Sequence, residues 1–227
     1  MNGGILVVPG SPALIPELGA RAVDENATRL VCAAREIIAA HGRCRIDIVG
    51  SRDERWRTGH EGSFKAWGAP DVTVSTGAYL PELVARWLLE PVVGDRQVRE
   101  VRGNLGDPSP AEDSVQDVLT VVVIDGSAGM TPRAPLALRE DAPAAHQWCR
   151  AVLGAQCPQP VTASWLADAG VVEPELWLEI AQWRRRHPGV GAHLLQEDVS
   201  QGVARYVAWL GQQQSEQQQS GQRQGGQ

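Results

Sequence analysis

The stretch "GILVVPGSP", residues 4–12, runs from an apolar segment directly into a turn that two prolines bound. Such an uninterrupted apolar run is typical of a strand in a sheet that is covered on both faces. Residues 24–41 follow with helix-start signals and apolar residues at helical spacing, and residues 45–50 resemble a second strand. A strand, a helix and a strand in this order are typical of a parallel βαβ unit, so the sequence predicts an α/β fold.

Later segments extend this pattern. We expect further strands at 71–75, 118–124 and 203–209, and helices at 81–90, 140–153, 161–168, 174–186 and 193–197. The prediction is one α/β domain over residues 1–210, with a central, mostly parallel sheet flanked by helices on both faces. Residues 211–227 are rich in Gln, Ser and Gly, and we expect them to form a disordered tail.

Composition narrows the function classes. The net charge of −6 does not favour binding to nucleic acid or to an anionic membrane. The longest apolar runs, 5–8 and 118–124, are far shorter than the roughly 20 residues that span a bilayer, and the N-terminus lacks the features of a secretory signal. The cysteines form no CxxC pair and no zinc-like spacing with histidine. We therefore expect a cytoplasmic protein, and the bias towards Arg, Ala, Gly and Val suggests a bacterial origin.

Ligands of open α/β sheets bind at the carboxyl ends of strands, which directs attention to three segments. These are the turn at 9–12, the long polar loop at 51–70 and the Gly-rich turn at 125–135. Loops as long as 51–70 are often functional inside a compact domain. Residues 102–116 have the composition of a surface loop.

The segment "DGSAG", residues 125–129, is similar to the G-x-S-x-G nucleophile elbow of serine hydrolases. Asp125 stands where the first Gly belongs, and the following "MTPRAP" is interrupted by proline where the elbow needs a helix. A Gly-rich strand exit, with Asp125 and Ser127 bonded to nearby backbone, is the favoured interpretation. The glycines could also cradle an anion with help from Arg133, although no P-loop motif is present.

The histidines show no metal-binding spacing such as H-x-H or H-E-x-x-H. His60 lies in the long loop, and it is the one histidine that we single out as a functional candidate. The acidic residues Asp168, Glu173, Glu175 and Glu179 lie on or beside predicted helices, where a solvated helix face explains them.

Five short stretches, taken together and in their order along the chain, allow a comparison with a known family: PGSPALIPEL (9–18), GSFKAWGAP (62–70), LPELVARWLLE (80–90), DGSAGMTPRAP (125–135) and QGVARYVAWL (201–210). In these stretches the chain resembles the actinobacterial proteins of the LigB superfamily that are similar to class III extradiol ring-cleavage dioxygenases. The resemblance covers most of residues 4–210 and implies an α/β fold with a central sheet flanked by helices.

The active members of that superfamily cleave catechols with O₂ at a non-haem Fe(II), which two histidines and one carboxylate hold while a further histidine acts as base. The resemblance places the first ligand in a Pro-His-x-Pro turn, where this chain has Gly10. It places the second ligand shortly after the second strand, at 50–53, and the base in the turn at 125–129, and neither segment contains a histidine. The resemblance therefore implies a member that has lost its metal site.

The favoured hypothesis is a non-dioxygenase member of the family that keeps a pocket for a small-molecule ligand, with no cofactor and no metal. One alternative is an active extradiol dioxygenase with relocated Fe(II) ligands at His60, His193 and Glu197. The other alternative is a serine hydrolase that uses Ser127. The candidate pocket residues are Pro9, Gly10, Ser11, His60, Asp125, Gly126, Ser127 and Arg133.

Overall fold

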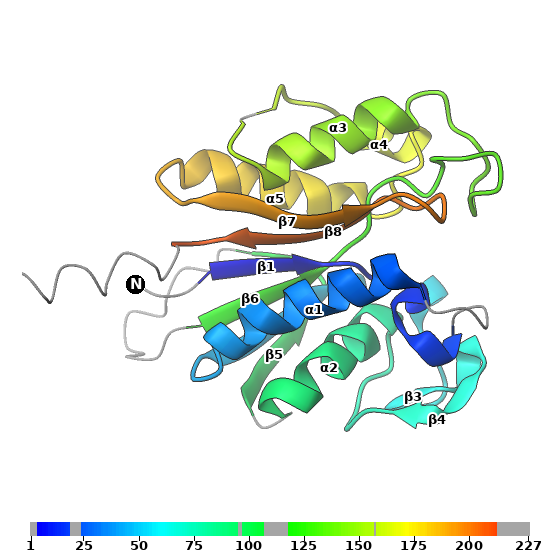
Figure 1. Ribbon diagram of the computed structural model, residues 1–227. Helices are drawn as coiled ribbons and strands as arrows, with labels where there is room; N and C mark the ends of the chain where they lie inside the picture. The colour runs from blue at the N-terminus through cyan, green and yellow to red at the C-terminus, as the bar shows by residue number, and fades with distance from the viewer. Residues whose placement is uncertain (1–3, 19–23, 95–96, 107–117, 157, 213–227) are drawn as a thin grey trace, which may run out of the picture.

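The first strand, β1 (Gly4–Val8), lies inside a six-stranded sheet with the strand order β5-β2-β6-β1-β8-β7 (Figure 1). The computed structural model describes residues 4–18, 24–94, 97–106, 118–156 and 158–212. The other strands of this sheet are β2 (Arg45–Gly50), β5 (Val98–Arg102), β6 (Val118–Val123), β7 (Ala192–Asp198) and β8 (Arg205–Leu210). A separate short hairpin pairs β3 (Ser63–Phe64) with β4 (Ala69–Thr73).

The sheet is mostly parallel, as predicted. β5, β2, β6 and β1 run in the same direction, whereas β8 is antiparallel to β1 and β7 is antiparallel to β8. β6 lies between β1 and β2, so the βαβ unit read from the sequence skips one strand position. All four parallel strands therefore have their carboxyl ends at the same edge of the sheet.

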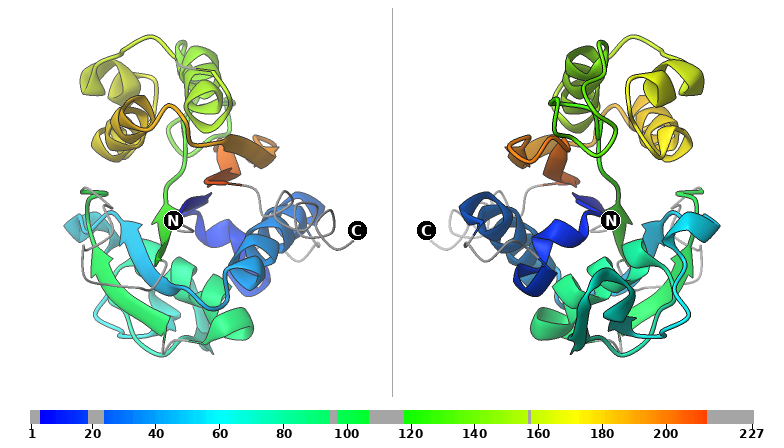
Figure 2. Two further views of the ribbon diagram at one scale, coloured as in Figure 1. Left: turned by 90° about the vertical axis from the view of Figure 1, so that its left-hand side faces the viewer. Right: turned by 90° about the vertical axis from the view of Figure 1, so that its right-hand side faces the viewer.

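Helices cover both faces of the sheet, which also confirms the prediction. α1 (Glu25–Ala40) and α2 (Leu80–Val93) lie on one face, and α3 (Ala142–Leu153), α4 (Ala163–Asp168) and α5 (Pro174–Arg186) lie on the other (Figures 1 and 2). In β1, Leu6 and Val8 pack with the α1 and α2 layer, while Ile5 and Val7 pack with the α3 and α5 layer. Because alternate side chains of a strand point to opposite faces, a strand buried on both sides needs an uninterrupted apolar sequence.

Local signals explain where α1 begins. The Asp24 carboxylate accepts hydrogen bonds from the backbone N–H groups of Asn26 and Ala27, at 3.0 and 3.1 Å, and so caps the helix. The buried residues of α1 are spaced three or four positions apart, as the sequence pattern required: Ala27, Leu30, Val31, Ala34 and Ile38.

One predicted element is wrong. Residues 193–197 were expected to be helical, but they belong to strand β7. β7 pairs along its length with β8, from Ala192 opposite Leu210 to Asp198 opposite Arg205. These long-range backbone hydrogen bonds override the local preference of a short segment. The edge strand β5 was not predicted, and the strand expected at 71–75 is observed slightly earlier, as β4.

Some predictions lie largely outside the described residues. These are most of the tail expected at 211–227 and most of the surface loop expected at 102–116. Within the described part of the chain, no helix combines the length and the apolar character that crossing a bilayer requires.

Candidate functional site

A pocket of about 170 Å³ opens at the carboxyl ends of β1 and β6, which is where open α/β sheets bind ligands. The turn after β1, the loop after β2, the first turn of α2, the turn after β6 and the segment before α5 all contribute to its wall. The lining residues are Gly10, Ser11, Pro12, Ser51, Trp56, Leu80, Pro81, Val123, Ile124, Asp125, Gly126, Ala128, Pro135, Val172, Glu173 and Val203.

The structure brings four of the candidate residues together in this wall: Gly10, Ser11, Asp125 and Gly126. The other four do not line it. Pro9 and Ser127 are buried, and His60 and Arg133 are exposed on loops.

Gly10 leaves space at the pocket wall. Its backbone has no positive φ, so the turn does not require a glycine. A Cβ atom at position 10 would meet Asp125 Oδ2 at 3.4 Å and Val123 Cγ1 at 3.5 Å, which are ordinary van der Waals distances. The structure would therefore tolerate a Cβ atom at position 10, and the absence of a side chain there widens the pocket.

Asp125 is a carboxylate of the wall whose pKa the surroundings shift. Its Oδ1 oxygen is out of contact with solvent and has no hydrogen-bond partner among the described residues. Burial raises the pKa of Asp125 to about 7, while the Arg205 charge and the Gly10 N–H favour the ionised form. The indole N–H of Trp177 donates to the backbone carbonyl of Asp125 at 2.8 Å and holds this segment in place. Near neutral pH, the carboxyl therefore exists in both its neutral and its charged form.

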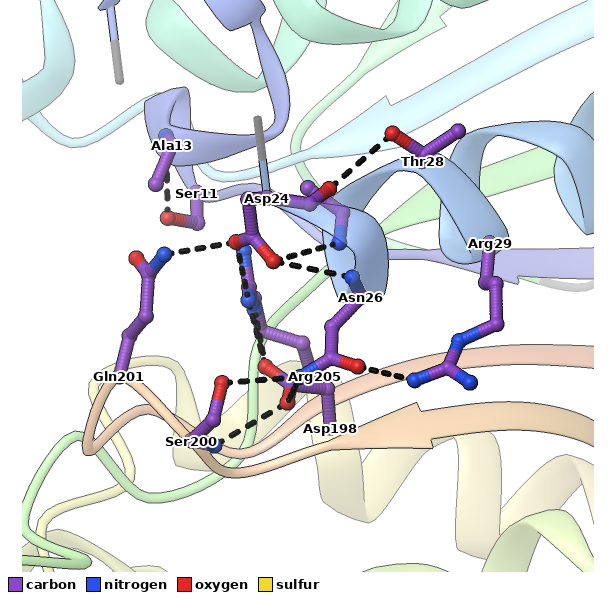
Figure 3. Close-up of polar contacts among 11 residues, drawn as sticks. Ser11, Ala13, Asp24, Asn26, Thr28, Arg29, Asp198, Ser200, Gln201 and Arg205 are labelled. Carbon is purple, nitrogen blue, oxygen red and sulfur yellow. Dashed lines mark hydrogen bonds and ion pairs between the residues drawn. The ribbon is translucent and has the colours of Figure 1, made fainter. Parts of the chain in front are cut away.

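The Arg205 guanidinium is fully buried and lies in a network that joins α1 to the β7–β8 turn (Figure 3). Its Nε donates to Asp198 at 3.0 Å, and its Nη2 donates to Asp198 and, at 3.2 Å, to Asp24. Gln201 donates to Asp24 at 2.6 Å, and Asn26 donates to Asp198 at 2.8 Å. Removing one partner of such a buried ion pair typically costs about 3–5 kcal/mol, because the other charge is left buried and unpaired, so the fold beside the site depends on both partners being present.

Ser127 connects two loops. Its hydroxyl donates to the carbonyl of Ala169 at 2.6 Å and accepts from the N–H of Gly129 at 3.1 Å. No helix follows Ser127 until α3 begins at Ala142, which agrees with the proline-interrupted sequence. The bond with Gly129 is a local backbone bond of the kind that the sequence interpretation favoured, whereas the bond with Ala169 joins residues 42 positions apart.

Gly126, in contrast to Gly10, is required by packing. A Cβ atom at this position would lie 2.8 Å from both the hydroxyl and the Cε2 of Tyr206. Its backbone N–H donates to the carbonyl of Ala204 at 2.7 Å, which ties the turn after β6 to the start of β8.

Two wall residues that the sequence did not single out as site candidates are Trp56 and Glu173. The indole N–H of Trp56 donates to Glu173 Oε1 at 2.8 Å, and this bond joins the long loop to the segment before α5. The length of the loop at 51–70 correctly indicated that the loop borders the site, but the residues of this loop in the pocket wall are Ser51 and Trp56 and not the predicted His60. Glu173 was interpreted as part of a solvated helix face, although it is half-buried and borders the pocket.

The donors present do not fit a centre of two histidines and one carboxylate. The pocket wall supplies two carboxylates, from Asp125 and Glu173, and no imidazole among the described residues. No group of three or more His, Cys, Asp or Glu side chains within the described ranges is arranged to hold a metal ion.

The relocated ligands considered from the sequence are not close together. His60 is exposed on its loop. His193 lies opposite Trp209, whose ring contacts His41 at the end of α1. Glu197 is on the other side of the sheet, where it pairs with Arg150 of α3 at 2.8 Å.

Comparison of the sequence with protein-family models and with curated proteins gave no match.

Proposed function

We propose that this chain is a LigB-like protein without the iron centre of the superfamily, and that it binds a small, mostly apolar molecule in the pocket beside Gly10. The observation that carries the proposal is the open pocket of about 170 Å³ at the carboxyl ends of β1 and β6. A cavity of about 150 Å³ is large enough for benzene, so the occupant is about the size of one ring.

The wall has the composition of a small-molecule site. Most of its side chains are apolar, and a few polar groups converge on them, from Ser11, Ser51, Asp125 and Glu173. Apolar burial supplies the driving force for binding, at about 25 cal/mol for each Å² removed from water, and the polar groups orient the ligand.

The resemblance supports the loss of iron chemistry. Gly10 occupies the place of a metal-binding histidine between two prolines, and the pocket donors include no imidazole within the described residues. With glycine in place of histidine, the turn has no metal ligand, and open volume remains next to Asp125. The same turn that would hold iron in an active relative then borders the ligand directly.

Ligand-observed NMR with benzyl alcohol, phenol, benzylamine and benzoate tests the proposal. We expect at least one of these probes to bind with a Kd of about 1 mM or tighter, which is within the range for so few atoms. Gly10→Leu places a side chain in the pocket and should abolish binding while the protein stays folded. Gly59→Leu is the matched control, because no atom of the described residues lies within 4 Å of a Cβ at that exposed glycine. The proposal fails if no probe binds or if Gly10→Leu binds as the wild type does.

The iron alternative has its own test. Anaerobic addition of Fe(II) followed by a panel of catechols in air should give no yellow ring-opened product. Stoichiometric iron in the purified protein that is lost in His60→Ala would overturn the proposal and favour the relocated ligand set.

A further inference from the structure

The charged side chains of the pocket wall all have the same sign. Asp125 and Glu173 are its two ionisable residues, and within the described part of the chain the wall contains no Lys, Arg or His. The nearby cation Arg205 does not line the pocket, and its Nε and Nη2 groups bind Asp198 and Asp24. Its Nη1 has no hydrogen-bond partner in the described structure, and its charge favours the ionised form of Asp125 from behind the wall. A ligand in this pocket therefore meets negative charge that the wall itself does not compensate.

Asp125 is available for an incoming donor. Its Oδ2 lies 3.4 Å from the point where a side chain at position 10 would begin, so the carboxyl borders the space that Gly10 leaves open. Its Oδ1 has no hydrogen-bond partner in the described structure. Because Oδ1 is closed off from solvent, a ligand donor would bind the carboxyl at Oδ2, which borders the space beside Gly10.

Glu173 is the second carboxylate of the wall, and Trp56 holds it in place. Its half-buried indole lines the pocket, and its N–H is bound to Glu173 at 2.8 Å. This bond holds the ring and the carboxylate next to each other in one wall. The Glu173 carboxylate, fixed in the wall by this bond, is the group of the pair that attracts a cation.

The helices that begin at the pocket do not reverse this balance. α2 and α5 both start at the wall, and a helix N-terminus carries only about half a positive charge. Each helix also has a proline within its first two residues, Pro81 and Pro174, and a proline offers no N–H to an anion. Above pH 7, where Asp125 is mostly ionised, the two carboxylates of the wall outweigh these partial charges.

We propose that the ligand of this pocket is a small organic amine, with its ammonium group beside Asp125 and one ring-sized apolar group against the apolar wall. The inference rests on the proposed function and names the ligand class of the same site. A carboxylic acid of the same size would bring a third negative charge next to Asp125 and Glu173, and a neutral alcohol would gain less from either residue.

The site predicts a pH dependence for amine binding. Because the pKa of Asp125 is raised to about 7 in the free protein, the carboxyl must lose its proton to attract the ammonium fully. The charged or titratable groups that act on Asp125 are Arg205 and Tyr206 of β8, and Glu173 lies in the same pocket wall. Amine affinity should therefore rise between pH 5.5 and pH 8, whereas alcohol affinity should not.

Calorimetric or NMR titration with benzylamine, benzyl alcohol and benzoate tests this inference on the full chain. At pH 8 we expect benzylamine to bind at least about tenfold more tightly than benzyl alcohol, as a hydrogen bond to a charged group implies, and benzoate to bind most weakly. Asp125→Asn should remove the preference for the amine and its pH dependence. Glu173→Gln should reduce the preference, and Asp71→Asn, on exposed β4, should leave it unchanged.

The outcomes separate this inference from the proposed function. If benzyl alcohol binds as tightly as benzylamine and Gly10→Leu abolishes both, the pocket stands and the amine inference is wrong. If benzoate binds best, the site is an anion site and the inference is also overturned. If none of the probes binds, the proposed function fails and the inference fails with it. An amine preference that survives Asp125→Asn and Glu173→Gln would contradict the placement of the ammonium.

Discussion

Asp125→Asn is expected to make the protein more stable than the wild type, and increasingly so as the pH rises. Burial places the pKa of Asp125 at about 7 in the folded protein, against an ordinary value of 3.8. Between these two pH values the folded protein keeps a proton that the unfolded chain has released. Unfolding then releases a proton, so the free energy of unfolding falls as the pH rises through this window.

The size of the effect follows from the two pKa values. They differ by about 3 units, and at about 1.4 kcal/mol per unit the wild type loses about 4 kcal/mol of stability once the pH exceeds 7. Below 3.8 both states hold the proton and the loss vanishes. A total stability of about 5–15 kcal/mol is usual for a domain, so this loss is a large fraction.

Urea unfolding followed by tryptophan fluorescence measures the effect at a series of pH values. From pH 5 to pH 8 we expect the free energy of unfolding of Asp125→Asn to rise relative to the wild type by about 3 kcal/mol. The histidines and Arg205 are common to both proteins, so their contributions largely cancel in the difference. Parallel pH profiles for the two proteins would refute the reasoning, and the control Asp71→Asn should show such a parallel profile.

Three further predictions concern the surroundings of the pocket. Gly126→Ala should lower the free energy of unfolding by about 1–3 kcal/mol, because the added methyl group overlaps a buried tyrosine ring. The control Gly59→Ala should change it by less than about 0.5 kcal/mol. Equal values for the two variants in urea unfolding would contradict the packing argument. Ser127→Ala should lower the thermal midpoint, because a buried carbonyl and a buried N–H lose their partner at a cost of about 1–3 kcal/mol. The wild type should not react with a fluorophosphonate probe. Labelling of the wild type that disappears in the variant would instead favour a hydrolase. Arg205→Met should lower the free energy of unfolding by about 3–5 kcal/mol, as measured in urea, and adding Asp198→Asn should recover part of this loss. A double variant that is no more stable than Arg205→Met alone would argue against the ion pair.

The sequence alone was sufficient for the class of fold and for the edge of the sheet where the pocket lies. The apolar runs at 4–8 and 118–124 and the helical spacing at 24–41 are local patterns, and the burial of a strand or helix face imposes them directly. Because parallel strands end at the same edge, the turns after the two runs could be placed together, and Gly10, Ser11, Asp125 and Gly126 were found in this way.

Only the tertiary structure decided which neighbours complete each element and which side chains reach the pocket. Residues 193–197 form a strand because β8 lies beside them, and no property of the segment itself indicates that partner. Trp56 and Glu173 are 117 positions apart, so their hydrogen bond has no sequence signature. Asp125 and Ser127 occupy one short turn, yet Asp125 lines the pocket and Ser127 is buried behind it. Contacts between distant segments determine these differences, and those contacts exist only once the chain has folded.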